Sequence, residues 1–463
     1  MLHTEGSGIV NEAGEVVILR AAAIGGFLNM ENFITGYAGH EHEHRAQMAA
    51  VLGEKKAKFL FDRLLHHFFT NEDAAMFAGL GLNCIRIPFN YRQFFDDMDP
   101  DTFKPEGFAW LDRCVDICAR HNIYAILELH ALLGGQNQDW HCDSGTTRAA
   151  FWDFKDHQDR IIRFWQVLAG RYARNPVVAG HNPLNEPADP TLNSAGRPGA
   201  RLLAWYARAE KAIRSVDPII CSSLTVILPN TVYAIHDYSK FGFPGEEQYT
   251  GTDTQKIRLR ASFDRKVKFM RSAGVPVWNG EFGPVNDGVE ATKVNNAGRI
   301  ALLEQQLSIY RETGVSWSIW LYKDIGYQGM AYVDPNSAYL RLIWPFLDKK
   351  QRLGLDCWTI VSREAVQSVY QPFLASIRDM VDPCFRTGRY PYQWTLERQF
   401  ERVIREALLS EYVGWELAEL FRDKTEDELE ELAASFALKN CRTRDDLNET
   451  LRRDGAATIK LSK

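Results

Sequence analysis

The chain has 463 residues, enough for one large barrel with extensions or for two or three average domains. Its 54 basic and 60 acidic residues give a net charge of −6, which argues against nucleic acid as the main partner because phosphate binding needs a basic surface. No run approaches the roughly 18 apolar residues of a membrane span. The first six residues lack the basic and apolar regions of a secretory signal, and the eight cysteines include no C-x-x-C pair. We therefore expect reduced thiols and a cytoplasmic protein.

Strand-like and helix-like segments alternate from the amino terminus to about residue 345. The first strand is predicted at 16–23, and the excursion 29–70 that follows is expected to be a long loop near a barrel mouth. Its alternating histidines at 40–44 could suggest a metal site, but no spaced ligand cluster accompanies them, so a solvated loop is the preferred interpretation. Residues 71–81 are predicted to form a helix, with an Asn cap, acidic residues in the first turn and a terminal glycine.

The middle of the chain continues the alternation of strands and helices. The predicted helix at 107–121, for example, places Leu111, Cys114, Val115 and Cys118 on one apolar face. The elements predicted after residue 81 are strand 84–88, helix 107–121, strand 124–130, helix 156–174, strand 177–184, helix 198–216, strand 231–238, helix 253–273, strand 275–283, helix 292–313 and strand 315–321.

Residues 219–228 interrupt this rhythm. They hold the fifth strand signal but supply only about ten residues before the next strand, whereas a crossover with its helix alone takes at least about 10–12. The fifth βα unit is therefore predicted to be abbreviated, with its helix absent.

Eight strand signals with helices between most of them predict an α/β fold, a (β/α)₈ TIM barrel over residues 1–385. The composition changes from Arg386 onward, where charge-rich helices are predicted at 397–422 and 425–451. We expect residues 386–463 to form a helical extension that packs on the barrel or joins subunits in a homo-oligomer. Nothing in this extension suggests chemistry.

Two apolar runs end in a glutamate. The strand at 177–184 leads into Asn185-Glu186-Pro187, and the strand at 275–283 contains Glu281 between glycines. The carboxyl ends of barrel strands face the active site. Two carboxyl groups there are what chemistry at the acetal carbon of a sugar requires.

Other polar or aromatic side chains stand at the predicted carboxyl ends of the strands. Each alone has an ordinary structural explanation, such as a salt bridge at the rim or packing in the core. All of them at one end of a single barrel favour an active site. With the two glutamates, these residues are Arg86, His130, Asn185, Glu186, His236, Tyr238, Glu281 and Trp320.

The residue types suggest roles. Glu281 is the expected nucleophile, kept ionised by Arg86 and oriented by Tyr238. Glu186 is the expected general acid and then general base, and it has to hold a proton near neutral pH.

The other side chains are expected to contact the sugar. Asn185 can donate to its 2-hydroxyl, His130 and His236 can orient hydroxyls and the acid, and Trp320 can form the floor of the sugar site by stacking.

These residues resemble glycoside hydrolase family 5, over roughly residues 9–348. The resemblance implies a retaining double displacement with Glu186 as acid/base, Glu281 as nucleophile, no metal or other cofactor, and carboxyl groups about 5–5.5 Å apart. The matching stretches are 19–20, 25–28, 83–88, 127–130, 185–187, 236–238, 280–283 and 317–320.

The substrate is expected to be a β-glycoside. The loop containing Gln136 and Asn137 resembles the corresponding loop of fungal exo-β-1,3-glucanases and β-glucosidases of this family, which adds both residues to the expected substrate contacts. Long loops such as 29–70 would wall off the groove, so we expect exo action on β-glucosides or short β-glucans. An endo-β-glycanase, a β-mannosidase and a catalytically impaired carbohydrate-binding barrel remain as alternatives.

Overall fold

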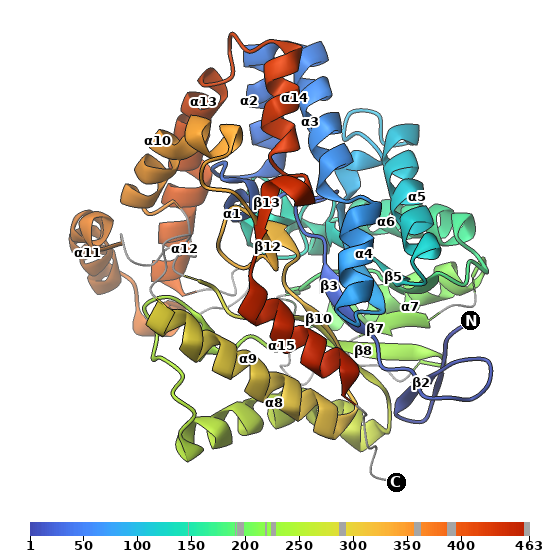
Figure 1. Cartoon of the computed structure of the whole chain (residues 1–463). Helices are drawn as coiled ribbons and strands as arrows, with labels where there is room; N and C mark the ends of the chain where they lie inside the picture. Colours follow the sequence, from blue (N-terminus) through green and yellow to red (C-terminus); the bar gives the residue numbers. More distant parts are fainter. Residues whose placement is uncertain are drawn as a thin grey trace.

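The computed structural model describes residues 1–146, 148–189, 191, 199–217, 220–223, 228–286, 293–355, 363–386 and 395–457. Eight parallel strands close into a barrel, with β10 pairing with β3 to complete the ring (Figure 1). This confirms the predicted (β/α)₈ fold. The strands are β3 (Arg20–Ala23), β4 (Cys84–Asn90), β5 (Tyr124–Ala131), β6 (Val178–Asn182), β7 (Ile220–Ser223), β8 (Thr231–His236), β9 (Val277–Phe282) and β10 (Ser316–Ile319).

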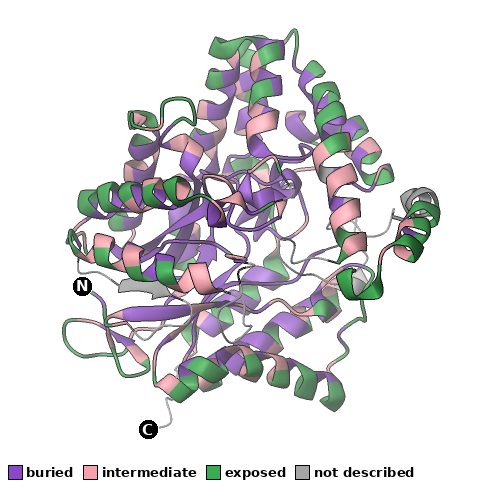
Figure 2. Ribbon diagram, turned by 180° about the vertical axis from the view of Figure 1, so that it is seen from behind, coloured by how far each residue is buried: buried purple, intermediate pink, exposed green. Residues whose placement is uncertain are grey.

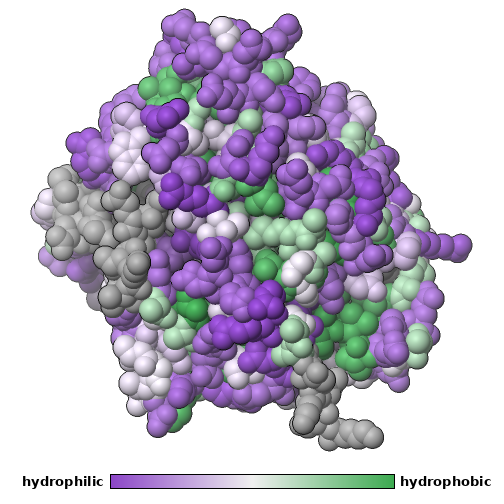
Figure 3. Space-filling model, viewed as in Figure 1, coloured by the Kyte–Doolittle hydropathy of each residue, from purple (hydrophilic) through white to green (hydrophobic). Residues whose placement is uncertain are grey.

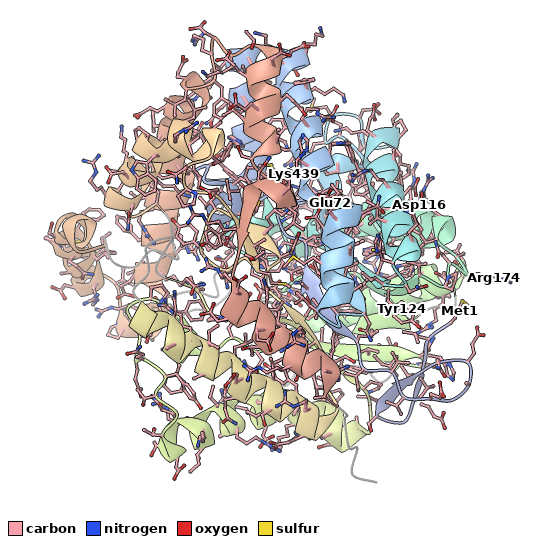
Figure 4. All side chains as sticks on the ribbon, in the orientation of Figure 1. Met1, Glu72, Asp116, Tyr124, Arg174 and Lys439 are labelled. Carbon is pink, nitrogen blue, oxygen red and sulfur yellow. The ribbon has the colours of Figure 1, made fainter. Side chains whose placement is uncertain are left out.

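Helices surround the barrel and turn their apolar faces inward, so that exposed residues follow their outer edges (Figure 2). Leu111, Cys114 and Cys118 of α5 are completely buried, as their helical spacing predicts. Glu72 on α4 and Asp116 on α5 point to solvent (Figure 4). These helices are α4 (Asn71–Gly79), α5 (Pro105–Arg120), α6 (Lys155–Arg171), α7 (Ala200–Arg214), α8 (Asp253–Ala273), α9 (Lys293–Thr313) and α10 (Ala338–Arg352). The predicted first residues of two helices, 198 and 292, lie outside the described residues.

The cap of α4 is Thr70 rather than the predicted Asn71. Thr70 and Asp73 form a capping box, in which each side chain bonds the backbone of the other residue. An Asn before acidic residues resembles a cap, but here the residue before it offers the hydroxyl.

A two-stranded hairpin closes the amino end of the barrel. It consists of β1 (His3–Glu5) and β2 (Gly8–Val10). Its side chains Leu2 and Ile9 pack with Leu19, Val232 and other residues from the strands in a buried apolar cluster separate from the main core. The barrel interior at this end is therefore filled with side chains, as in other barrels of this kind.

The fifth βα unit is abbreviated as predicted. The strand β7 is present and lies between β6 and β8 in the barrel. Only seven positions, 224–230, separate its end from β8, which leaves no room for a crossover helix. Four of these positions, 224–227, lie outside the described residues.

The excursion 29–70 is not the predicted loop. It forms α1 (Asn32–Thr35), α2 (Glu41–Leu52) and α3 (Glu54–Phe68). In α3 the residues Ala57, Leu60, Phe61 and Leu65 are buried at helical spacing, a pattern that predicts a helix. The mixed polar sequence of α2 obscured this signal.

The histidine-rich stretch at 40–44 is also not a solvated loop. It opens α2, and His40, Glu41 and His44 are buried. The His44 ring stacks on Tyr37 with centroids 4.7 Å apart, and burial lowers the pKa of His44 to about 3. The side chain is therefore a neutral core residue near neutral pH.

The carboxyl-terminal segment wraps back over the barrel. Its helices α14 and α15 lie beside α3 and α9 respectively (Figure 1). The predicted helix at 425–451 is interrupted, because β13 pairs antiparallel with β12 (Ala331–Val333) next to the barrel. The division of the chain at 385/386 stays a prediction. The helix α11 (Arg363–Met380) precedes this segment, which contains α12 (Leu396–Arg402), a π-helical stretch (Val403–Leu409), α13 (Ser410–Glu419), α14 (Glu426–Ala434), β13 (Cys441–Thr443) and α15 (Asp445–Ala456).

A buried lysine joins this segment to the barrel. Lys323 Nζ donates to Asp73 Oδ1 at 2.8 Å, to the Phe68 carbonyl at 2.9 Å and to the Phe436 carbonyl at 2.8 Å. Neither Lys323 nor Asp73 is exposed to solvent. Three acceptors satisfy the three donors of the ammonium group, which is what a buried charge requires.

The surface is mainly polar, as the ordinary content of charged residues predicts. The face shown in Figure 3 is mainly hydrophilic, with hydrophobic residues gathered in small areas. No helix in the described part of the chain is long and apolar enough to span a bilayer. The six cysteines whose side chains are described carry thiols rather than disulfides.

Candidate active site

The expected nucleophile is held by two donors at the carboxyl end of the barrel. Arg86 Nη1 donates to Glu281 Oε1 at 2.7 Å, and Tyr238 Oη donates to Glu281 Oε2 at 2.9 Å. Burial and the negative charge of Glu281 raise the pKa of Tyr238 well above its usual range, so the phenol remains a donor. One oxygen is paired with a cation and the other with a neutral donor, which fixes the carboxylate plane.

Arg86 is itself held by a carboxylate that the sequence did not mark as a site residue. Glu128 on β5 pairs with Arg86 and accepts hydrogen bonds from Asn182 at 2.7 Å and from His130 at 2.7 Å. Burial raises the pKa of Glu128, but the Arg86 charge and the His130 hydrogen bond outweigh it and set the pKa to about 2. Glu128 is therefore ionised and orients the residues that line the site.

His130 lies between two carboxylates. Its Nδ1 bonds Glu128, and its Nε2 lies 3.3 Å from Glu31 Oε1. Burial lowers the pKa of His130, but the hydrogen bonds to Glu128 and Glu31 outweigh it and raise the pKa to about 9. The ring is therefore a cation near neutral pH, with its charge fixed at the base of the site.

Glu186 follows β6 and has a left-handed backbone with φ of 41°. His236 Nδ1 donates to its Oε1 at 2.6 Å, and His141 Nε2 lies 3.7 Å from its Oε2. Burial raises the pKa of Glu186, but the His236 hydrogen bond and the charges of His236, His141 and His130 outweigh it and hold the pKa below its usual range. The expectation that Glu186 keeps a proton near neutral pH is therefore wrong for the ligand-free protein.

The two catalytic candidates lie close together. A carboxyl oxygen of Glu186, one of Glu281 and a ring nitrogen of His236 are all within 4.8 Å of one another. The spacing between carboxyl groups is about 5–5.5 Å in retaining glycosidases and about 6.5–9.5 Å in inverting ones. The contact between the Glu186 and Glu281 oxygens, within 4.8 Å, agrees with the shorter spacing.

Two groups of side chains in the described part of the chain could in principle hold a metal ion. Glu281 belongs to both, with Glu128 and His130 in one and with Glu186 and His236 in the other. Both oxygens of Glu281 already accept hydrogen bonds from Arg86 and Tyr238. These donors favour proton and nucleophile chemistry over metal ligation.

Asn185 and Trp320 complete the predicted set. Asn185 Oδ1 accepts from Arg86 at 2.9 Å, and its Nδ2 lies 3.3 Å from His130 Nε2. The Trp320 ring stacks on His130 with centroids 5.2 Å apart and planes within 6°. A Cβ atom at Gly25 would lie 2.7 Å from the indole, so glycine is required there to make room for Trp320.

Gln136 and Asn137 contact the backbone of the site. Gln136 Nε2 donates to the carbonyls of His130 at 2.6 Å and Asn185 at 2.9 Å. Asn137 Nδ2 donates to the Glu186 carbonyl at 2.9 Å. Both side chains are buried, so they hold the segments that carry the catalytic groups. Their direct contact with substrate stays a prediction.

A cavity of about 170 Å³ opens over these residues. Sequence reasoning missed half of its lining. Glu31 could have been found from its place just after the first barrel strand, whereas Arg398 and Arg402 come from α12, the segment in which no chemistry was expected. The cavity is lined by Glu31, His130, Asp139, Trp140, His141, Asn185, Glu186, Tyr238, Glu281, Trp320, Arg398 and Arg402.

The helix α12 is fastened to the loop that follows β5. Arg402 Nη2 lies 2.6 Å from Asp139 Oδ1, and its guanidinium carbon lies 4.3 Å from the centroid of the Trp140 ring. Gln138 Nε2 donates to Gln399 Oε1 at 3.2 Å. The carboxyl-terminal segment therefore supplies one wall of the cavity.

A barrel with paired carboxylates at the carboxyl ends of its strands, one of them held by an arginine and a tyrosine, defines a glycoside hydrolase. The chain belongs to glycosyl hydrolase family 5, since the family model described as "Cellulase (glycosyl hydrolase family 5)" matches residues 56–326 and a relative matches nearly the whole chain. That relative, named "Beta-xylosidase", is from Phanerodontia chrysosporium and is 48% identical over 97% of each chain.

More distant relatives cover only part of the chain. A "Glucan 1,3-beta-glucosidase" of Blumeria graminis is 30% identical over 37% of this chain and 41% of its own. Among solved structures, the rutinosidase from Aspergillus niger superposes with a TM-score of 0.52 at 18% identity, covering 67% of this chain and 90% of that one. This similarity shows the shared fold.

Proposed function

We propose that this glycoside hydrolase is an exo-acting, retaining β-glycosidase that works by double displacement. The observation that carries the proposal is the pair Glu186 and Glu281, whose carboxyl oxygens lie within 4.8 Å of each other in a small cavity. In the first step, Glu281 attacks the anomeric carbon while Glu186 gives a proton to the departing oxygen. In the second step, Glu186 takes a proton from water, which attacks the glycosyl ester and frees Glu281 and the sugar.

The first step requires Glu186 to be protonated. In the ligand-free protein the neighbouring histidines hold its pKa below the usual range. A sugar in the cavity excludes the water that solvates this carboxylate, which disfavours its charged form. Substrate binding therefore raises the pKa of Glu186 and allows it to take up the proton that the first step needs.

Exo action is supported by the size of the cavity. A volume of about 170 Å³ is well below the roughly 300–1,000 Å³ of pockets that hold drug-sized ligands, and it suits a single terminal sugar. Arg402 and Trp140 close one side of it, so a polysaccharide has no open path along this wall.

The proposed glycone is β-xylose, with β-glucose as the second candidate. A relative that matches 97% of the chain is named a β-xylosidase, and relatives that match over shorter stretches are named glucan 1,3-β-glucosidases. Mannosides and internal cleavage of glucans are the alternatives that the assays have to exclude.

The test is a panel of aryl β-glycosides (xyloside, glucoside, mannoside and galactoside), assayed with the wild type, Glu281→Ala and Glu186→Ala. We expect turnover on the xyloside or glucoside, with retained anomeric configuration in the first product. Glu281→Ala should lose at least about 10⁴-fold in kcat, as enzymes do when a catalytic nucleophile is removed. Turnover with inversion, or equal activity in Glu281→Ala, would overturn the mechanism.

A further inference from the structure

We propose that His42 and Asp143 form a positioning pair for the acid/base Glu186. The pair acts through the loop that follows β5, and it does not belong to the described lining of the cavity of about 170 Å³ over the catalytic carboxylates, here called the sugar cavity. The inference rests on the proposed function and adds two residues to it. His42 comes from the histidine-rich stretch at 40–44, and Asp143 ends the loop after β5.

The carboxylate of Asp143 is buried and accepts four hydrogen bonds. His42 donates to Oδ1 from its backbone nitrogen at 2.9 Å and from its ring Nδ1 at 2.7 Å. Asn90 Nδ2 and Arg92 Nε donate to Oδ2 at 2.8 Å and 3.1 Å. Burial raises the pKa of Asp143, but the His42 hydrogen bond and the charges of His42 and Arg92 outweigh it and hold the pKa below its usual range. Donors on both oxygens therefore fix an ionised carboxylate in one orientation.

The backbone around the pair is shaped to bring the two side chains together. Asp143 has a left-handed backbone with φ of 50°, and its N–H bonds the Trp140 carbonyl at 2.9 Å to close the 3₁₀ turn Trp140–Cys142. Aspartate is one of the few residues besides glycine that adopt this conformation readily. A Cβ atom at Gly145 would lie 2.9 Å from the His42 ring, so glycine is required there to make room for the imidazole.

The turn that Asp143 closes presents His141 to the acid/base. His141 lines the sugar cavity, and its Nε2 lies 3.7 Å from Glu186 Oε2, while His236 bonds the other oxygen at 2.6 Å. Asn137 of the same loop donates to the Glu186 carbonyl and lies 2.9 Å from His141 Nε2. One histidine beside each oxygen limits rotation of the carboxyl group, which has to point at the glycosidic oxygen to give its proton.

The pair and the acid/base line different cavities. His42 and Asp143 line a cavity of about 540 Å³ between α2, α3 and α5, whereas His141 and Glu186 line the sugar cavity. Substitutions in the pair therefore remove no side chain from the lining of the sugar cavity. An effect of such a substitution on proton transfer has to pass through the loop.

The experiment compares a poor and a good leaving group on the preferred sugar. Phenolate is a poor leaving group and needs the proton of the acid, whereas 2,4-dinitrophenolate departs without it. We expect Asp143→Ala to lower kcat/KM about tenfold on the phenyl β-glycoside, because a small displacement of a catalytic group is costly. The 2,4-dinitrophenyl β-glycoside should stay within about twofold of the wild type. The ratio of the two constants is the readout, since damage to the fold would lower both alike.

His42→Ala removes the other half of the pair and should change the ratio in the same direction. The residue lies on a helix with its side chain partly exposed, so this variant provides the test if Asp143→Ala does not fold. In a His141→Ala background, Asp143→Ala should change the ratio no further, because its effect passes through His141. The matched control is Asp97→Ala. Asp97 also pairs with Arg92 but belongs to the loop after β4, so the ratio should stay at the wild-type value.

A ratio in Asp143→Ala and His42→Ala equal to that of the control would overturn the inference, as would a further change in the His141→Ala background. In these cases the wild type still cleaves glycosides, and the proposed function stands. If the wild type cleaves no glycoside, the proposed function fails, and nuclear magnetic resonance of protein labelled with ¹⁵N-histidine decides the inference. The His141 signals, assigned with His141→Ala, should move in Asp143→Ala and stay in place in Asp97→Ala. Equal movement in both variants, or none, would overturn it.

Discussion

A single histidine contacts both catalytic carboxylates. His236 Nδ1 lies 2.6 Å from Glu186 Oε1 and 3.5 Å from Glu281 Oε2. The hydrogen bond from His236 is the main cause of the lowered pKa of Glu186. Among the groups around Glu186, His236 therefore has the largest part in lowering its pKa.

This contact predicts a shift in the pH profile. Replacing the imidazole in His236→Asn removes the charge that lowers the pKa of Glu186, so this pKa rises and the acid stays protonated to higher pH. The alkaline limb of kcat/KM against pH, which reports the free enzyme, should move up by roughly one unit. His66→Asn, a substitution on the exposed face of α3, is the matched control. An alkaline limb that stays in place or moves down would contradict this assignment.

At the scale of an element, α12 acts as a wall of the sugar cavity. It touches the loop after β5 through Arg402 and Gln399, and the same loop carries His141 near Glu186. Position along the chain does not indicate this role, because more than two hundred residues separate α12 from the loop it contacts.

We expect Arg402→Ala to weaken substrate binding. The substitution leaves Asp139 without its closest cation and removes the guanidinium from the face of Trp140, so the cavity loses a side wall. KM should rise about tenfold, with a smaller change in kcat, because the catalytic carboxylates keep their partners. Arg422→Ala, which breaks an exposed ion pair with Glu419, should leave both constants close to wild type. A fall in kcat alone would argue against a wall and for a role in the chemical step.

At the scale of the whole molecule, the carboxyl-terminal segment is fastened to the barrel by more than surface contact. The strand β13 extends a sheet begun by β11 (Lys323–Asp324) and β12. Lys323 binds the barrel side through Asp73 and the segment through the Phe436 carbonyl. These contacts predict that barrel and segment unfold together.

Lys323→Met tests this coupling. It removes the cation but keeps most of the side-chain volume, and it leaves the buried Asp73 carboxylate without its charge partner. Breaking a buried pair on one side costs about 3–5 kcal/mol in the free energy of unfolding, which urea denaturation measures as a lower midpoint. Lys349→Met, in an exposed pair with Glu416, should change the midpoint little. Two separate transitions in the wild type, or equal midpoints for the two variants, would contradict the coupling.

The barrel and the residues at its strand ends were predictable because they follow local rules. A parallel strand is a short apolar run, and the residues at its carboxyl end reach the active site wherever the strand stands in the ring. Arg86, Asn185 and Glu281 meet for this reason. Local rules do not predict long-range packing, so Arg402 was not predicted to line the cavity. They also do not predict the electrostatic effect of neighbouring side chains such as His236, so the shift in the pKa of Glu186 was predicted in the wrong direction. The helix α2 was missed because its polar sequence lacks a clear apolar stripe.

The hairpin at the amino end of the barrel determines where the product can leave. The side chains that fill the barrel axis below the catalytic groups include Leu2, Ile9 and Trp278. A released sugar therefore cannot leave through the amino end of the barrel and has to leave past α12, by the opening through which the substrate entered. Product and substrate then compete for the same passage. Free sugar should therefore act as a competitive inhibitor, and turnover should slow as product accumulates.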